Sequence, residues 1–487
     1  MLAGLNSAVA SRDFPGYPMA MISPVIPIVV CLVWGWAGAL SAEPATWQAG
    51  PHLLLDRTVV AETAGLQRQV RPPSRMPDPL VTGFEDGNEQ PYVSVVRDAE
   101  TRRFGIWFNT PRPVGRGIAY MESEDGLHWL RPARLLKAPE AIGVGVSVID
   151  EGPGFAEPSR RFKLGWHEND GLRLAVSANG LDWTPLTPGP VVRANHDIVG
   201  IYRDPLRQRY LAALSIVPGA GPYKGLRIPH QSVSTNLLEW RPPWPIITPD
   251  PRAEIERGET QFYGLSAVIN RGSLLVAMVK VLRDDLNCEP DRTAADLGDK
   301  DRPFAGIGYT VVAWSLDGER WDRETQPFLD RNPQVGAWDR AMSWIDAQLV
   351  VGDFTYFYYG GYRWGHKAHR YTGRQIGFAQ MPRDRYAGYR AGADEGRLRT
   401  RPARLGKAVQ MTVNAEVDPE KGELRVRILD ANGAALPGFD WPDCRVVKGN
   451  RVAHPIAWKG ANATLRGKTV SFEFRFREGT LFAFDCL

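Results

Sequence analysis

Four acidic positions far apart in the chain are the strongest candidates for chemistry. They are Glu89, which represents the cluster Glu85–Glu89, and Asp197, Glu259 and Asp339. Each comes just before a segment that reads as a strand. Carboxylates gathered in one pocket can serve as nucleophile or base, as acid, and as a group that tunes the pKa of the others. Cleavage of a glycosidic bond needs such a set.

Two of these acidic residues also have a structural explanation. Asp197 would cap a turn, and Asp339 would form an ion pair with its neighbour Arg340. Glu259 stands in the run Gly258–Tyr263, which is too polar for a plain core strand. That run favours a functional role, and we expect Glu259 to be the general acid and Asp197 to orient or tune it.

Aromatic and basic side chains accompany these positions. Tyr263 and Trp338 are expected to stack on sugar rings, with packing between strands as the alternative. Arg340 and His366 are further candidates for substrate binding. His366 would bind a substrate hydroxyl or a central structural cation, or would be an ordinary hydrogen-bonded histidine. Apart from such a cation we expect no metal ion and no cofactor.

An internal repeat indicates the elements that must position these residues. Ser-x-Asp-Gly-x-x-Trp, in exact or varied form, occurs four times, and successive copies start 54, 57 and 81 residues apart. Each copy supplies a tight turn after an alternating strand. The copies are Ser123–Trp129, Ser177–Trp183, Ser234–Trp240 and Ser315–Trp321. This spacing is typical of the four-stranded blades of a β-propeller.

Counting the first strand of each unit predicts five blades. These strands are expected to open near Tyr92, Val146, Val199, Tyr263 and Ser343. The residues before such strands converge on one central funnel, which would bring the four acidic positions together. Sustained apolar spacing of three and four residues is not found, so the fold class is all-β.

The pattern changes after Thr400. A run of alternating strands without further copies of the repeat predicts an antiparallel β-sandwich. The expected domains are therefore a five-bladed propeller over residues 50–403 and a C-terminal sandwich over residues 404–487.

The N-terminal segment indicates export. The apolar stretch Val25–Trp36 is followed by small residues up to Ala42, which predicts a signal peptide over residues 1–42. An uncleaved membrane anchor is the alternative, although the stretch is shorter than the ~20 residues that a span requires. We expect a secreted or periplasmic protein with no stable membrane insertion after cleavage. A bridge between Cys444 and Cys486 stays open at this point.

Charge excludes one class of partner. The 59 Lys and Arg residues against 55 Asp and Glu residues give a formal net charge of +4, and the basic residues form no continuous stripe. A nucleic-acid partner is therefore not expected. No Cys-x-x-Cys spacing typical of a zinc site occurs.

Several segments resemble exported bacterial proteins related to glycoside hydrolase families 32 and 43. They are the repeats above, Leu53–Val60, Gly377–Tyr386, Leu436–Phe439 and His454–Gly460. The family 32 signature Trp-Met-Asn-Asp-Pro-Asn-Gly is absent. The resemblance to family 43 implies an Asp base, an Asp modulator and a Glu acid, placed at the blade-one acid, Asp197 and Glu259.

The expected function is thus an exported glycoside hydrolase with a carbohydrate substrate. Two alternatives stay open. A phosphate-dependent glycoside phosphorylase would use Arg340, Arg363 and His366 as a basic pocket, and a glycan-binding propeller would have no catalytic carboxylates. The glycan, its linkage and the stereochemical course depend on loop conformations that the sequence does not specify.

Overall fold

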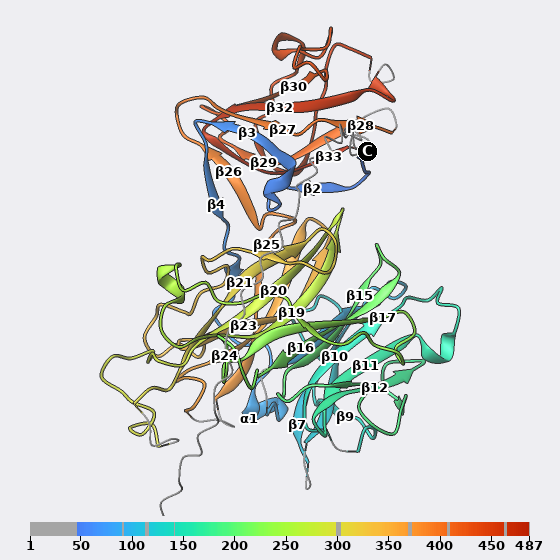
Figure 1. Cartoon of the computed structure of the whole chain (residues 1–487), viewed down its shortest axis with the longest axis vertical. Helices are drawn as coiled ribbons and strands as arrows, with labels where there is room; N and C mark the ends of the chain where they lie inside the picture. The colour runs from blue at the N-terminus through green and yellow to red at the C-terminus, as the bar shows by residue number, and fades with distance from the viewer. Residues whose placement is uncertain are drawn as a thin grey trace, which may run out of the picture. The chain divides into compact units, whose positions relative to one another are not determined.

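The computed structural model describes residues 46–89, 92–112, 116–140, 142–298, 303–368, 373–406, 410–461 and 465–486. The expected signal peptide lies outside these ranges. The regular elements of the described chain are almost all β-strands, which confirms the all-β prediction (Figure 1). Its short helices are α1 (Gly83–Asp86) and the 3-10 turns η1 (Arg57–Val59), η2 (Pro158–Arg160), η3 (Glu254–Glu256) and η4 (Trp441–Asp443). None of the helices in these ranges is long and apolar enough to cross a membrane.

Five antiparallel sheets follow one another along the middle of the chain. The first sheet contains β6 (Val93–Arg97), β7 (Phe104–Pro111), β8 (Arg116–Ser123) and β9 (Arg134–Leu135). The second contains β10 (Val144–Asp150), β11 (Phe162–His167), β12 (Gly171–Ser177) and β13 (Thr184–Pro185), and β14 (Val192–Arg193) also pairs with β12. The third contains β15 (Val199–Asp204), β16 (Arg209–Ile216), β17 (Ile228–Ser234) and β18 (Trp244–Pro245).

The fourth and fifth sheets are joined by one parallel bridge between Gly308 and Met342. They are β19 (Thr260–Arg271), β20 (Leu274–Arg283), β21 (Ile307–Ser315) and β22 (Asp322–Arg323); and β23 (Met342–Val351), β24 (Phe354–Tyr362), β25 (Arg374–Pro382) and β5 (Ser74–Arg75). The fifth sheet thus takes its last strand from the N-terminal part of the chain.

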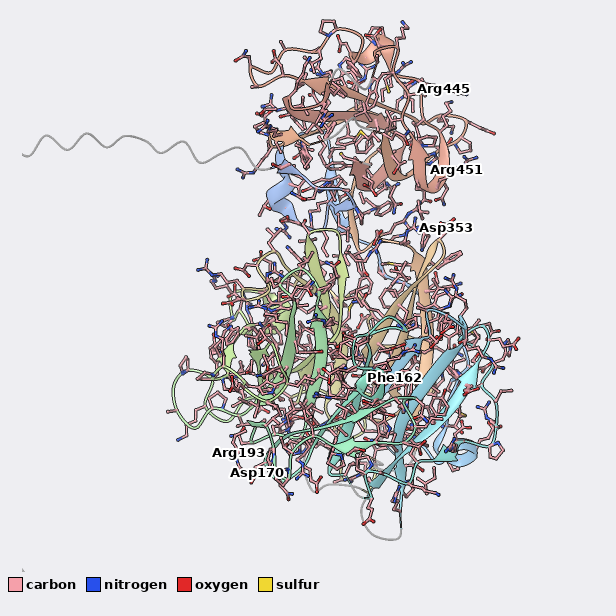
Figure 2. The ribbon with its side chains drawn as sticks, turned by 90° about the vertical axis from the view of Figure 1, so that its right-hand side faces the viewer. Phe162, Asp170, Arg193, Asp353, Arg445 and Arg451 are labelled. Atoms are coloured by element: carbon pink, nitrogen blue, oxygen red, sulfur yellow. The ribbon has the colours of Figure 1, made fainter. Side chains whose placement is uncertain are left out.

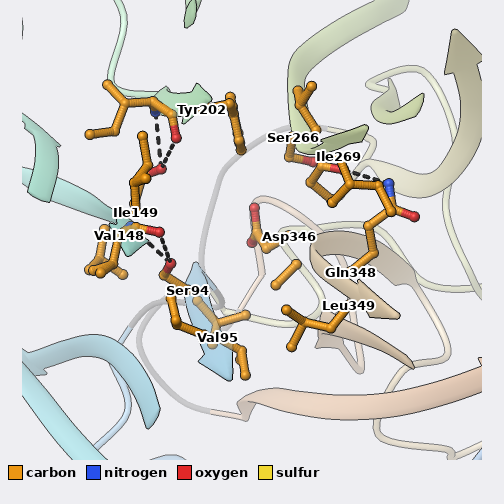
Figure 3. Close-up of a pocket in the computed structure, with 18 of the residues that line it drawn as sticks. Ser94, Val95, Val148, Ile149, Tyr202, Ser266, Ile269, Asp346, Gln348 and Leu349 are labelled. Atoms are coloured by element: carbon orange, nitrogen blue, oxygen red, sulfur yellow. Dashed lines mark hydrogen bonds between the residues drawn. The ribbon is translucent and has the colours of Figure 1, made fainter. Parts of the chain in front are cut away.

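The first strands of the five sheets, β6, β10, β15, β19 and β23, contact one another in a closed ring. Serine side chains join neighbours in this ring, because these strands do not pair through a backbone ladder. Ser147 Oγ accepts from Ile201 N at 3.0 Å and donates to Ile201 O at 3.0 Å. Ser94 Oγ likewise accepts from Val148 N at 2.9 Å (Figure 3).

Hydrogen bonds explain why the repeated turn contains serine and Asp or Asn. In the first copy Ser123 Oγ accepts from Gly126 N at 2.9 Å, and Asp125 Oδ1 accepts from His128 N at 2.9 Å. The residue after the Asp or Asn takes a positive φ, which favours glycine. Leu237 occupies this place in the third copy, at φ 68°. The tryptophan that ends the first copy, Trp129, is buried.

The outer edge of the second sheet shows how loops close against strands. Figure 2 labels Phe162, which begins β11, and shows Asp170 and Arg193 close together. The guanidinium of Arg193 donates to Asn169 O at 3.2 Å, and β14 pairs with β12 at this point. Asp197, one of the acidic positions discussed above, follows Arg193 by four residues.

Two further sheets contain the C-terminal strands together with strands from the N-terminal part. The first of these sheets has the order β1 (Thr46–Trp47), β28 (Ala403–Leu405), β32 (Thr469–Arg477), β27 (Gly396–Thr400) and β3 (Val60–Ala64), and β30 (Glu423–Leu429) also pairs with β32. The second has the order β31 (Gly449–Pro455), β29 (Met411–Val417), β33 (Gly479–Cys486), β26 (Ala387–Ala391) and β4 (Gln67–Val70), and β2 (Pro51–Leu53) also pairs with β33.

The pairing in these sheets crosses the boundary expected at residue 404, because β26, β27 and the strands over 46–70 pair with strands beyond it. Side chains of both sheets, among them Leu398 and Phe474 of the first and Val413 of the second, form one apolar core. Cys444 and Cys486 belong to that core, and both thiols are free. The bridge between them that the sequence left open is not formed.

Candidate functional site

A polar cavity of about 280 Å³ receives residues from four of the five sheets and Asp197 from the segment just before the third sheet. Its lining includes Arg116 at the start of β8, His167 at the end of β11, Asp197 before β15, Tyr263 in β19 and Tyr362 at the end of β24. These residues lie at strand ends or next to them, so the ring of first strands determines how they converge. Asp197, Tyr263 and His366, which the sequence selected separately, all line this cavity.

Asp197 faces the cavity beside His196. The Asp197 side chain is 43% exposed, so a ligand can reach it, whereas His196 is 15% exposed. Arg227 donates its Nε–H to Nε2 of His196 at 2.8 Å. A guanidinium has no acceptor, so Nε2 carries no proton, and the neutral ring must hold its proton on Nδ1.

The Nδ1 atom of His196 lies 3.1 Å from Oδ1 of Asp197. The contact is electrostatic, since its angle does not suit a hydrogen bond. Burial lowers the pKa of His196 to about 4, and the charge of Asp197 acts in the opposite direction. A neutral histidine therefore presents its Nδ1–H dipole to the carboxylate at neutral pH.

Tyrosines and histidines form the apolar and hydroxyl-bearing part of the wall. The Tyr263 hydroxyl and His366 Nε2 share a hydrogen bond of 3.1 Å. The Tyr263 ring packs on Trp344 with centroids 4.7 Å apart. Burial raises the pKa of Tyr263, and the charge of Asp197 raises it further. Burial also raises the pKa of Tyr92, so both phenols stay protonated.

Two arginines add positive charge to the lining. Arg116 Nε lies 3.1 Å from Glu89 Oε1, and Arg116 Nη1 donates to Gly143 O at 2.7 Å. Arg374 is 6% exposed, and its guanidinium lies 4.7 Å from the centre of the Tyr362 ring. Glu89 is thus brought to the edge of the cavity through Arg116 and does not itself line it.

Glu259 is not among the residues that line the cavity of Asp197. Its side chain is exposed, one residue before β19 begins at Thr260. Gln261 takes the buried place instead, where its Nε2 donates to Asp284 Oδ2 at 3.1 Å. The position of Glu259 therefore does not support the role of general acid expected from the sequence.

Asp339 and Arg340 are held in other contacts. Asp339 is fully buried and accepts from Arg75 at 2.7 Å and from the Tyr359 hydroxyl at 2.9 Å. Arg340 pairs with Glu289 at 3.0 Å and not with Asp339. The ion pair expected between these neighbours is replaced by two others, and neither residue lines the Asp197 cavity.

Sequence reasoning missed Tyr92, Arg116, His167, Tyr362 and Arg374 as lining residues. Tyr92 directly precedes β6, so the rule that selected Asp197 could have found it. The other four lie on second or third strands, or at their ends, and no local pattern indicates that these ends meet. In the described ranges, no group of three or more His, Cys, Asp and Glu residues is arranged to hold a metal ion.

A larger cavity of about 370 Å³ lies among the first strands themselves, with Val95, Ile149 and Leu349 in its wall (Figure 3). Asp346 lies at its centre in an ion pair with Lys280, which is nearly fully buried. Burial raises the pKa of Asp346, and Lys280 lowers it. Lys280 Nζ also lies 4.7 Å from the Tyr92 ring centre, and Tyr92 lines both cavities.

Comparison with known proteins yields similar structures but no family. No protein-family model and no curated protein matches the chain. A solved member of the GH130 family of mannoside phosphorylases, which contains glycoside hydrolases that target β-1,2 mannosidic linkages in Candida mannan, has a TM-score of 0.43 and 13% identity over 65% of this chain and 95% of its own.

Two other solved structures show similar values. A glycosyl hydrolase from Bacteroides ovatus has a TM-score of 0.42 and 12% identity, covering 65% of this chain and 95% of its own. An N-acetylgalactosamine deacetylase from F. plautii, in complex with blood group B trisaccharide, has a TM-score of 0.40 and 14% identity, covering 66% and 97%.

Proposed function

We propose that this chain is an exported glycoside hydrolase with Asp197 at its reacting centre. In this proposal the five sheets from β6 to β25 are the blades of a β-propeller, and the sheets of the C-terminal strands form a β-sandwich. The observation that carries the proposal is the polar cavity in which Asp197, just before the third sheet, meets side chains of the other four sheets. Concave sites with convergent polar groups are where ligands bind.

Asp197 is assigned the role of nucleophile or base, because it is the carboxylate in the cavity that a ligand can reach. His196 Nδ1 lies 3.1 Å from it without a hydrogen bond. Glu89 is the proposed second carboxylate, held at the cavity edge by Arg116. The phenols of Tyr92 and Tyr263, which line the cavity, would contact sugar hydroxyls. A pair of carboxylates is what hydrolysis of a glycosidic bond requires.

The test is Asp197→Asn, assayed on a panel of plant, algal and bacterial polysaccharides. We expect turnover to fall about a hundredfold or more while sugar binding is kept, because the amide preserves the shape but cannot act as base or nucleophile. Glu259→Gln is the matched control and should leave turnover unchanged, since Glu259 is exposed outside the cavity. Equal turnover of wild type and Asp197→Asn on every cleaved substrate would refute the assignment.

Phosphorolysis is a second candidate, favoured by the composition of the cavity. Among the described residues, Asp197 is the one carboxylate in its lining, whereas Arg116, Arg374, His167 and His366 are basic. Phosphate could replace water as the attacking group there, because guanidinium groups bind phosphate through paired hydrogen bonds. Release of a sugar phosphate only when inorganic phosphate is present would select this candidate over hydrolysis.

Export is part of the proposal and rests on the apolar stretch before Ala42. Expression of the full chain in a Gram-negative host should yield mature protein in the periplasm or medium. N-terminal sequencing is expected to start at Glu43. Protein that keeps residues 1–42 in the membrane fraction would favour an anchor instead.

A further inference from the structure

A second cavity of about 260 Å³ adjoins the cavity of Asp197. The two share Tyr362 and Arg374 in their walls. The second is lined by aromatic side chains that the first lacks, Phe84, Trp338 and Trp364. Each volume lies below the range of about 300–1,000 Å³ typical of sites for drug-sized ligands, so each has room for about one sugar ring. Together they have room for two linked rings.

Trp338 lies flat against the fifth sheet. Its indole is stacked on Tyr359, with ring centroids 5.4 Å apart and planes 20° apart. Its Nε1–H donates to Pro77 O at 2.9 Å, which fixes the orientation of the ring. Gly361 and Gly377 lie beneath it, and a Cβ on either glycine would overlap the indole. The absence of side chains at these two positions lets the ring approach the strands this closely.

The side chain of Phe84 is exposed to solvent, whereas contacts of neighbouring residues fix its backbone. It is 88% exposed, the most exposed of the large apolar side chains in the described ranges. Two residues further on, Asp86 is buried and pairs with Arg131 Nε at 2.7 Å. The Thr82 hydroxyl accepts from Glu85 N at 3.0 Å and caps α1. Packing within the protein does not explain the ring of Phe84, because little of it is in contact with other residues.

We propose that the second cavity is a sugar-binding subsite, in which Trp338 and Phe84 stack against the ring that follows the one beside Asp197. The protein would then act on oligosaccharides or polysaccharides and not on single sugars. The inference rests on the proposed function, since it takes the Asp197 cavity as the first subsite. Flat aromatic side chains provide large contact areas for the apolar faces of sugars. Arg374, in both walls, lies where the two rings would be linked.

The experiment compares ligand length. Binding of monosaccharides and of matching tri- and tetrasaccharides from mannan, xylan, arabinan, galactan and rhamnogalacturonan is measured by calorimetry on the full chain. We expect the longer ligand of at least one series to bind tenfold or more tightly than its monosaccharide. Phe84→Ala should remove most of this gain and leave monosaccharide binding unchanged.

Phe354→Ala is the matched control. Phe354 is also an exposed phenylalanine, at 42%, and it starts β24, whereas Tyr362 ends that strand. At about 3.3 Å a residue it lies far from both cavities. Trp338→Leu provides a second variant that keeps an apolar side chain over the glycines and should show the same loss as Phe84→Ala.

The outcomes separate the two proposals. If single sugars bind as tightly as the longer chains, or if Phe84→Ala binds every length as wild type does, the second subsite is refuted and the proposed function stands. If no glycan of any length binds, the proposed function fails and the subsite fails with it. A loss of equal size in Phe354→Ala would also contradict the subsite.

Discussion

Protonation of His196 is the reason why we expect acid to destabilise the candidate site. Its pKa is about 4 in the folded protein, against about 6.5 for an unperturbed histidine. Between these values the unfolded chain binds a proton that the folded chain does not. The free energy of unfolding should therefore decrease as the pH falls from about 6.5 to about 4, by at most ~3 kcal/mol from this residue.

Urea denaturation of wild type and His196→Gln between about pH 7 and pH 4 measures this effect. We expect the variant to lose less stability on acidification than wild type, because glutamine takes up no proton in this range. Ser159→Ala, at an exposed position that does not titrate, is the control, and it should follow the wild-type curve. A His196→Gln curve parallel to that of wild type would contradict the assigned pKa.

At the residue scale, proximity to a predicted first strand identified some residues of the candidate site and missed others. Asp197 and Tyr263 lie before or within first strands, and those strands set where their side chains point. Glu259 misled because β19 begins only at Thr260, so the alternation of the strand no longer determines its direction. Arg116 and Arg374 begin strands of two different sheets, and only the closed ring brings them to one cavity.

The serine links between first strands are the element-scale feature that the sequence did not reveal. Ser147→Ala would leave the buried N–H and C=O of Ile201 without their partner. An unsatisfied buried polar group costs about 1–3 kcal/mol. We expect chemical denaturation to show a loss of this size in the free energy of unfolding.

Ser159→Ala is the matched control for that variant. Ser159 is exposed in η2, so its replacement should change stability by no more than about 0.5 kcal/mol. If the two variants were equally stable, the serine hydrogen bonds would add nothing to the free energy of unfolding beyond what hydrogen bonds to water provide. A loss confined to Ser147→Ala would show that they help to hold neighbouring sheets together.

At the scale of the whole molecule, the sequence repeats predicted where the strands begin, but the sequence did not predict which distant strands pair. The first strands begin within three residues of the expected positions Tyr92, Val146, Val199, Tyr263 and Ser343, because each repeat marks its own sheet. The pairing of β3 and β4 with β27 and β26 was not foreseen. These partners are more than 300 residues apart, and short alternating strands carry no signal of their partner.

That pairing leads to a prediction about where the chain can be divided. A fragment of residues 46–403 would keep β26, β27 and the N-terminal strands but lose β32 and β33, on which both sheets depend. Leu398, fully buried in the whole protein, would become exposed. Two-stranded pairs are only marginally stable in water, so these strands should aggregate or unfold. A fragment of residues 71–386 contains all five middle sheets and none of the orphaned strands.

We therefore expect fragment 71–386 to give several-fold more soluble monomer than fragment 46–403 in size-exclusion chromatography, even though it is the shorter of the two. The added length of 46–403 should be harmful because it carries apolar strand faces without their partner strands. Thermal unfolding of the intact chain provides the reference. If fragment 46–403 were monomeric and unfolded at the temperature of the intact chain, a true domain boundary would lie at residue 404, and the strand pairing across it would contribute nothing to stability.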